Sequence, residues 1–193
     1  MKIDSVEYTF EISNKAYESV DGKVGAICMT KGLFDMLIEF IGKHKRYLEI
    51  GTFDGILISS LAERYKDMTI NAIDAFIGAS GTGGGHLSFV IENCKRYDNI
   101  SLFKEKSVTA LKKLKESGCM FDVILIDGDH SYEATIIDLN GSWEVLVPGG
   151  TIMVHDYGIE LTKNAVDEFV DSHRADIDRL SYENIMMFSK KMR

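Results

Sequence analysis

The chain has 193 residues, of which 45% are hydrophobic and 27% are charged, as expected for one soluble globular domain. Its formal net charge of −8 argues against a non-specific nucleic-acid-binding protein, and its three widely spaced cysteines form neither a zinc pattern nor a disulfide framework. No apolar run approaches the ~20 residues of a membrane span, and the first residues lack the apolar core of a signal peptide, so we expect a cytoplasmic protein that binds neither nucleic acid nor membranes.

The N-terminal segment, residues 1–29, carries no readable motif. Its stretch VEYTFEI alternates weakly, as an edge strand does, and we expect the segment to cap the substrate or to form an edge element. From Thr30, which can cap a helix, apolar residues recur at helical spacing as far as Gly42, where a helix would stop. We therefore expect the main domain to span residues 30–193.

Beyond this helix, short apolar strands alternate with helices. Strands are predicted over residues 47–50, 69–73, 100–104, 121–126 and 151–154. Helices are predicted over residues 55–65, 87–97, 108–116, 132–146 and 161–172. The stretch LVPGG, residues 146–150, predicts a turn. The last residues predict two strands joined by a turn near residues 182–184.

This order of elements predicts an α/β fold. We expect a Rossmann-like, doubly wound, seven-stranded sheet with helices on both faces. The sheet would be mostly parallel, with one antiparallel strand in the C-terminal hairpin, because no helix separates the last two strands. Ligands of such folds bind at the carboxyl ends of the strands, near the switch in strand order.

The first strand runs into a glycine turn, EIGTFDG, that opens a helix. Phe53 stands where the dinucleotide fingerprint needs its second glycine, and no G-K-[ST] follows as in a P-loop. Glu49 would repel a phosphate, so the turn suits a cationic, hydroxyl-bearing ligand better. The second strand ends at Asp74, 23 positions after Gly51, where a carboxylate can accept hydrogen bonds from a ribose diol. The alternative is that Asp74 is merely structural.

Acidic residues and histidines end two further strands. Asp127, Asp129 and His130 follow the fourth strand, and His155 and Asp156 follow the fifth. Because neighbouring strand ends lie ~5 Å apart, we expect Asp127 and Asp156 to face one site, where oxygen ligands suit Mg²⁺ or Ca²⁺. His155 as a further ligand would favour Mn²⁺, Fe²⁺ or Zn²⁺. In the alternative interpretation, Asp129 only satisfies its own turn and His130 only orients Asp127 or the next helix.

A glycine cluster, GASGTGGGH, covers residues 78–86 directly after the second strand. It would lie over the ligand proposed at that strand end. Two interpretations remain open, a flexible connector and a lid that orders when the ligand binds.

Together these residues resemble the class I S-adenosylmethionine-dependent methyltransferases. YLEIGTFDG resembles their glycine-turn motif, and IDAF resembles their ribose-binding strand end. The block FDVILIDGDHSYEATIIDLNGSWEVLVPGGTIMVHDY is most similar to the metal-dependent small-molecule O-methyltransferases. That group includes the macrocin and aminocoumarin sugar methyltransferases and the cephalosporin hydroxylase-like proteins. The resemblance extends from about residue 30 to the C-terminus.

The resemblance implies a role for each matching residue. It implies a cofactor-binding set at the strand ends and in the turns that follow them: Glu49, Gly51, Thr52, Gly55, Asp74, Ser107 and Asp127. Within this set Asp74 would bind the ribose hydroxyls and Ser107 would lie near the adenine. It further implies a divalent metal, Mg²⁺ in the first place, on Asp127, Asp156 and His155. Asp129 would be the general base, with His130 as a second catalytic residue.

The prediction is therefore an S-adenosylmethionine-dependent methyltransferase that methylates a hydroxyl of a small-molecule substrate, assisted by a divalent metal and an aspartate base. A metal-dependent hydroxylase- or hydrolase-like enzyme on the same fold is the main alternative. A metal-independent methyltransferase with Asp129 or His130 as the base, an NAD-dependent oxidoreductase and a catalytically silent binding module are the others. A homodimer is compatible with the sequence, which does not identify the methyl acceptor.

Overall fold

The structure, a computed structural model, describes residues 23, 29–77, 86–182 and 184–192. The edge strand predicted within residues 1–29 and nearly all of the glycine cluster lie outside the described residues. Among the described residues no helix combines the length and the apolar character needed to cross a bilayer. Cys94 and Cys119 are free thiols, as predicted for them.

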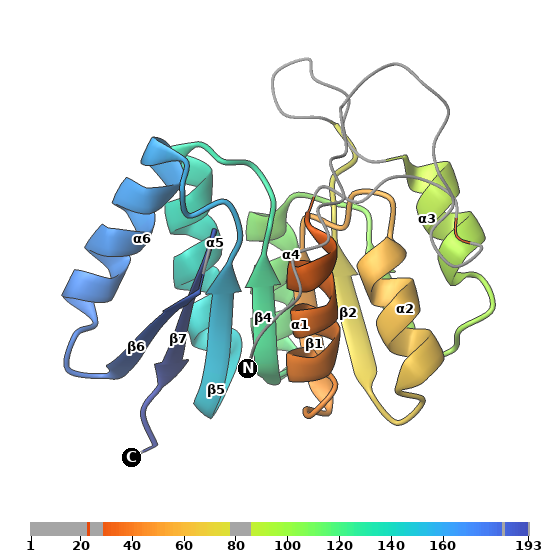
Figure 1. Ribbon diagram of the computed structural model, residues 1–193, viewed down its shortest axis with the longest axis horizontal. Helices are drawn as coiled ribbons and strands as arrows, with labels where there is room; N and C mark the ends of the chain where they lie inside the picture. The colour runs from red at the N-terminus through yellow and green to blue at the C-terminus, as the bar shows by residue number, and fades with distance from the viewer. Residues whose placement is uncertain (1–22, 24–28, 78–85, 183, 193) are drawn as a thin grey trace.

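A seven-stranded sheet with the order β3-β2-β1-β4-β5-β7-β6 forms the middle layer (Figure 1). Within the described residues β7 alone runs antiparallel to its neighbours, β5 and β6, which confirms the predicted C-terminal hairpin. The strand order reverses between β1 and β4, which creates the switch point expected for ligand binding. The strands are β1 (Arg46–Ile50), β2 (Thr69–Ile73), β3 (Ile100–Phe103), β4 (Phe121–Ile126), β5 (Leu146–Val154), β6 (Ile177–Tyr182) and β7 (Ile185–Lys190).

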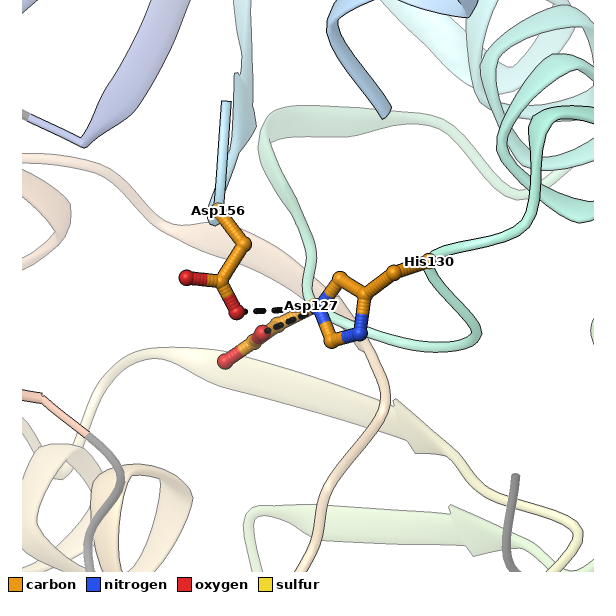
Figure 2. A group of neighbouring side chains, drawn as sticks. All are labelled: Asp127, His130 and Asp156. Carbon is orange, nitrogen blue, oxygen red and sulfur yellow. Dashed lines mark ion pairs between the residues drawn. The ribbon is translucent and has the colours of Figure 1, made fainter. Parts of the chain in front are cut away.

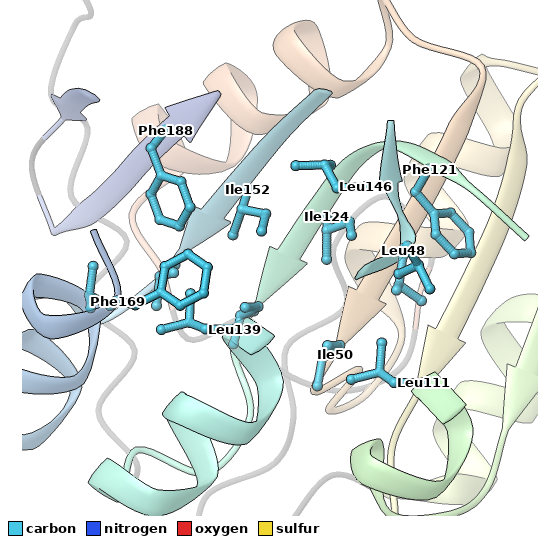
Figure 3. Packing of buried hydrophobic residues seen from close by; sticks show 14 of the residues in the cluster. Leu48, Ile50, Leu111, Phe121, Ile124, Leu139, Leu146, Ile152, Phe169 and Phe188 are labelled. Atoms are coloured by element: carbon cyan, nitrogen blue, oxygen red, sulfur yellow. The ribbon is translucent and has the colours of Figure 1, made fainter. Parts of the chain in front are cut away.

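Helices cover both faces of this sheet. They are α1 (Lys31–Ile41), α2 (Ile56–Arg64), α3 (Leu87–Cys94), α4 (Ser107–Glu116), α5 (Tyr132–Val145) and α6 (Glu160–Ser172). Buried side chains of α1, α2 and α3 pack on one face of the sheet, and those of α4, α5 and α6 pack on the other. Figure 3 shows the second of these cores, in which Leu111, Leu139 and Phe169 contact the strands. The predicted α/β fold, a seven-stranded sheet with helices on both faces, is confirmed.

The helix starts follow from local polar chemistry. Thr30 is the N-cap of α1, and its hydroxyl accepts a hydrogen bond from the Leu33 amide at 3.2 Å. Ser131 caps α5 in the same way, with the Ala134 amide as donor at 3.3 Å. A cap satisfies an amide that has no partner inside the helix, so these two caps help to fix where α1 and α5 begin.

The prediction of a turn at residues 146–150, ahead of the fifth strand, was wrong, because β5 already begins at Leu146. Leu146 pairs with Phe121 and Thr151 pairs with Val123, so the proline–glycine stretch bulges out between two points of the same ladder. Gly149 has a φ of 80°, which lets the chain bend there without ending the strand. A bulge and a turn share the same residue preferences, which is why the sequence favoured the turn.

Two contacts fix β1 against β4 at opposite ends of the sheet. At the amino end the Asp122 carboxylate accepts hydrogen bonds from the Lys45 and Arg46 amides, at 3.2 and 2.9 Å, and pairs with the Arg46 guanidinium. At the carboxyl end the Asp127 amide donates to the Ile50 carbonyl at 2.8 Å. The register of the two central strands, and therefore the position of the loops that follow them, is set by these contacts.

Candidate active site

The carboxyl ends of β1, β2, β4 and β5 meet at one edge of the sheet. The glycine turn follows β1, and its Gly51 and Gly55 have φ angles of 88° and 73°. A Cβ atom on Gly51 would lie 2.0 Å from the carbonyl oxygen of Asp127. Only glycine fits there, because this close approach brings the turn against the loop that follows β4.

The carboxylate of Asp74 holds this turn. Its Oδ2 accepts hydrogen bonds from the amides of Thr52 and Phe53, both at 3.0 Å, and its Oδ1 accepts one from the Phe76 amide at 2.7 Å. This is the structural role considered as the alternative for Asp74. A carboxylate accepts about four hydrogen bonds, so the three contacts leave room for a ribose hydroxyl. The ribose role stays a prediction.

Glu49 presents a buried carboxyl group at the end of β1. Its exposed fraction is 3%, and the Tyr47 hydroxyl donates a hydrogen bond to its Oε2 at 2.6 Å. Burial, together with the negative charges of Asp127 and Asp74, raises the pKa of Glu49 to about 8 although the Tyr47 bond opposes the rise. Glu49 therefore readily takes up a proton near neutral pH, and a bound cation would favour its ionised form.

Asp54 ties the glycine turn to the start of α3, a contact that the sequence analysis missed. Its carboxylate is 1% exposed and accepts the His86 amide at 2.8 Å, and the His86 ring nitrogen Nδ1 lies 3.1 Å away. The Asn93 side chain donates to the Asp54 carbonyl at 2.9 Å. The sequence shows only an aspartate in a turn that precedes a helix. Aspartates are common at helix starts, so this pattern alone does not predict the contact with His86.

The loops after β4 and β5 bring together Asp127, His130 and Asp156 (Figure 2). Each offers one potential ligand atom, and these atoms all lie within 4.8 Å of one another. Nε2 of His130 is 3.0 Å from Asp156 Oδ2 and 3.7 Å from Asp127 Oδ1. The proximity of the two aspartates agrees with the prediction, and their role as metal ligands stays a prediction.

His155 lies beside the same two carboxylates. Its side chain is 4% exposed, and Nδ1 is 3.1 Å from Asp127 Oδ1 and 3.4 Å from Asp156 Oδ2. His155 was predicted as the third ligand, whereas the three-residue group with a shared ligand position contains His130 instead. His155 is the more deeply buried of the two rings and lies within ion-pair distance of both aspartates.

Electrostatics link these four groups. The carboxylates of Asp127 and Asp156 raise the pKa of His130 to about 9, against the effect of burial. Burial also disfavours a charged His155, but the same carboxylates outweigh it and raise its pKa to about 10. Burial opposes ionisation of Asp156 as well, yet the contacts with His130, His155 and Asn184 hold its pKa well below its usual range. Without a ligand, two imidazolium groups therefore neutralise two carboxylates.

Asp129 and Ser107, the other predicted site residues, lie outside this group; Asp129 is in the loop after β4, whereas Ser107 follows β3. Asp129 is exposed, and its Oδ1 accepts the Ser131 amide at 2.8 Å, which is the turn interaction considered as its alternative role. Ser107 begins α4, and its hydroxyl makes a hydrogen bond with the buried carboxyl of Asp138 on α5. Asp138 was missed, because a single aspartate in a helical pattern gives no sign that it is buried.

The fold is that of class I methyltransferases, and solved structures share it. The O-methyltransferase TomG from Streptomyces achromogenes, solved with S-adenosylmethionine, matches with a TM-score of 0.68 and 14% identity over 86% of this chain and 82% of that chain. An O-methyltransferase from Bacillus cereus, in complex with S-adenosylhomocysteine, matches with a TM-score of 0.66 and 15% identity over 84% of this chain and 82% of that chain. At these identities the likeness establishes the fold.

The sequence itself establishes the family. A family model described as a methyltransferase domain matches residues 48–157, and the chain belongs to this family. An uncharacterised protein of Acanthamoeba polyphaga mimivirus is 29% identical over 119 residues, which cover 58% of this chain and 51% of that protein. The chain thus spans about half the length of the curated relative it matches. The residues that the family model matches, 48–157, contain the glycine turn, Asp74 and the Asp127–Asp156 cluster.

Proposed function

We propose that the protein is an S-adenosylmethionine-dependent methyltransferase that methylates a hydroxyl of a small molecule. The observation that carries this proposal is the contact of Gly51 with the Asp127 carbonyl, which joins the glycine turn to the acidic cluster at the switch point. Membership of the methyltransferase-domain family supports it. So does the shared fold of O-methyltransferases solved with S-adenosylmethionine or S-adenosylhomocysteine.

The residues around the turn suit this cofactor chemically. Asp74 would accept hydrogen bonds from the ribose hydroxyls, and Gly51, Thr52 and Gly55 would give the cofactor close access to the backbone. Glu49, buried and acidic, would favour a sulfonium cation and disfavour a pyrophosphate. Ser107, held by Asp138, would lie at the adenine end.

A divalent metal fits the donor chemistry of the Asp127–His130–Asp156 group. Two carboxylates and one imidazole offer atoms within 4.8 Å of one another, and the buried Nε2 of His130 makes no hydrogen bond of good geometry with the described residues. Mg²⁺ is the proposed ion, and an imidazole ligand would also suit Mn²⁺, Fe²⁺ or Zn²⁺. When bound, such an ion would lower the pKa of an acceptor hydroxyl that ligates it.

The transfer itself is an in-line displacement. The acceptor oxygen forms a bond to the methyl carbon while the carbon–sulfur bond breaks, and the sulfonium leaves as a neutral thioether. The hydroxyl proton passes to a base, for which we propose Asp129, since one of its oxygens is fixed by the Ser131 amide and the side chain is exposed. The loops after β4 and β5 would align the two reactants.

One observation favours a second candidate, a metal-independent methyltransferase. The ion pairs of His130 and His155 with Asp127 and Asp156 already neutralise the cluster without a metal. In that case His130, 3.0 Å from Asp156, or Asp129 would handle the proton directly. Residual methyl transfer after complete chelation would separate this candidate from the metal-dependent one.

Calorimetric titration of the protein with S-adenosylmethionine and S-adenosylhomocysteine tests the proposal. Binding in the micromolar range, ~8 kcal/mol, that is lost in Asp74→Ala would support the cofactor role. After chelation, a heat of Mg²⁺ binding that is absent in Asp156→Ala would support the metal site. Folded protein that binds neither form of the cofactor would contradict the methyltransferase and favour a hydroxylase- or hydrolase-like enzyme or a silent module.

A further inference from the structure

Asn184 connects the turn between β6 and β7 to the loop that follows β5. Its side-chain nitrogen Nδ2 donates a hydrogen bond to Asp156 Oδ1 at 2.6 Å. Its side-chain oxygen accepts the Gly158 amide at 2.8 Å, and its backbone carbonyl accepts the Tyr157 amide at 3.0 Å. One residue of the C-terminal hairpin therefore contacts three successive residues beside the acidic cluster.

The sheet register explains why these residues meet. β5 and β7 pair antiparallel, with Val154 opposite Met186 at the carboxyl end of β5. Asp156, two positions after Val154, and Asn184, two positions before Met186, therefore stand opposite each other. The side-chain contact thus continues the strand ladder beyond its last backbone pair, and it depends on β7 having this register and no other.

Asp156 has a left-handed backbone conformation, with a φ angle of 54°. Aspartate is one of the few residues besides glycine that adopt this region, because its short polar side chain can form local hydrogen bonds. Gly158 lets the partner come close, because a Cβ atom there would lie 2.8 Å from the Asn184 side-chain oxygen. The turn after β5 and the Asn184 side chain are therefore sterically complementary.

The two oxygens of Asp156 are used differently. Oδ1 accepts the Asn184 amide, whereas Oδ2 lies 3.0 Å from His130 Nε2 and 3.4 Å from His155 Nδ1. By engaging Oδ1, Asn184 fixes the rotation of the carboxylate and leaves the other oxygen toward the cluster. Hydrogen bonds to the outer oxygen of a carboxylate ligand orient it in this way in metal sites.

We propose that Asn184 is a positioning residue that presents Asp156 Oδ2 to a divalent cation at the Asp127–His130–Asp156 group. The inference rests on the metal-dependent form of the proposed function. Asn184 does not itself touch the reacting groups. It links the occupancy of that site to the integrity of the C-terminal hairpin.

Metal titration of the full chain tests this role directly, with no need for a known acceptor. We would titrate chelated protein with Mn²⁺, following the heat and the spin-resonance signal of the free ion. Asn184→Ala is expected to weaken Mn²⁺ binding about 10- to 100-fold, the range of outer contacts of metal ligands. Asn140→Ala, an exposed asparagine on α5 whose side chain bonds only its own helix, is the matched control and should bind as the wild type does.

Asn184→Asp separates positioning from charge. It keeps an oxygen for the Gly158 amide but replaces the donor to Asp156 by a second carboxylate oxygen. Positioning predicts weaker Mn²⁺ binding than in the wild type, whereas a purely electrostatic contribution predicts tighter binding. Gly158→Ala, which pushes Asn184 away, should also weaken binding while binding of S-adenosylhomocysteine is retained.

The outcomes separate the two hypotheses. Wild-type affinity in Asn184→Ala, or tighter binding in Asn184→Asp, would overturn the positioning role and leave the metal site in place. A wild-type protein that binds no Mn²⁺ would overturn the metal site, and this inference with it. The cofactor titration described above is independent of both.

Discussion

Asp138 on α5 allows a sharp test of the electrostatics beneath the site. Its side chain is 3% exposed, and Oδ1 has no hydrogen-bond partner among the described residues. Burial raises the pKa of Asp138 from its ordinary 3.8 to about 6, with a contribution from the charge of Asp129, although the Ser107 hydroxyl opposes the rise. At a pH between 3.8 and about 6, Asp138 therefore keeps its proton in the folded protein, whereas the unfolded chain has released it.

The size of the effect follows from this difference. A shift of about two units corresponds to about 3 kcal/mol, since each unit is worth ~1.4 kcal/mol. Well below its ordinary pKa of 3.8 Asp138 is protonated in both states and contributes nothing. As the pH rises to about 6 the unfolded chain ionises first, so stability falls, and above this range the full cost persists. Asp138→Asn removes the titrating group, and its advantage over the wild type should grow by about 1 kcal/mol between about pH 5 and about pH 8.

Urea denaturation of both proteins near pH 5 and near pH 8 measures this difference. Carboxylates that do not interact with Asp138 titrate equally in both proteins, so the subtraction isolates Asp138 together with its coupling to Asp129. Ser142→Ala, one helical turn further along the same buried face of α5, is the control and should show no such pH dependence. A difference between Asp138→Asn and the wild type that stays constant with pH would refute the reasoning.

Three further predictions concern the turn, its floor and the first helix. Gly51→Ala should cost about 2 kcal/mol or more in urea denaturation and abolish binding of S-adenosylhomocysteine, because its Cβ atom would collide with the Asp127 carbonyl; normal binding would contradict the close approach. Calorimetry should show that S-adenosylmethionine binds more tightly as the pH rises through about 8, where Glu49 ionises, and that S-adenosylhomocysteine does not. In Glu49→Gln this pH dependence should be absent. If the variant kept it, the pH dependence would have to come from a group other than Glu49. Thr30→Ala should destabilise the fold by about 1 kcal/mol while Thr30→Ser should not, and equal stability of the two variants in thermal unfolding would exclude the cap.

The fold was predictable because its local patterns agree with one another. Short apolar runs such as residues 121–126 are buried on both faces, and the helices between them have one apolar side. Thr30 and Gly42 mark the ends of α1 as expected. The bulge in β5 was not predictable, because proline and glycine have the same local preference in a turn and in a bulge, and only the pairing of Leu146 with Phe121 decides between them.

The site was predictable only where a strand delivers its residues. Asp127 and Asp156 come together because Ile126 pairs with Val154, and a parallel sheet places both following loops at one edge. Contacts that depend on side-chain rotation or on distant register carry no local signal. The contacts of His130 and of Asn184 with Asp156 are both of this kind.

The pairing of β1 with β4 joins residues about 75 positions apart, and its two ends are fixed by Asp122 and by the Gly51 contact. During synthesis the first three strands can associate early, but β1 then presents an unpaired edge with buried-type residues until β4 has been made. β4, which carries Val123 and Leu125, in turn has an unpaired edge until β5 follows. Unpaired apolar edges of this kind recruit other chains. The nascent protein should therefore depend on rapid completion or on chaperones to avoid aggregation, a vulnerability built into the same strand order that assembles the site.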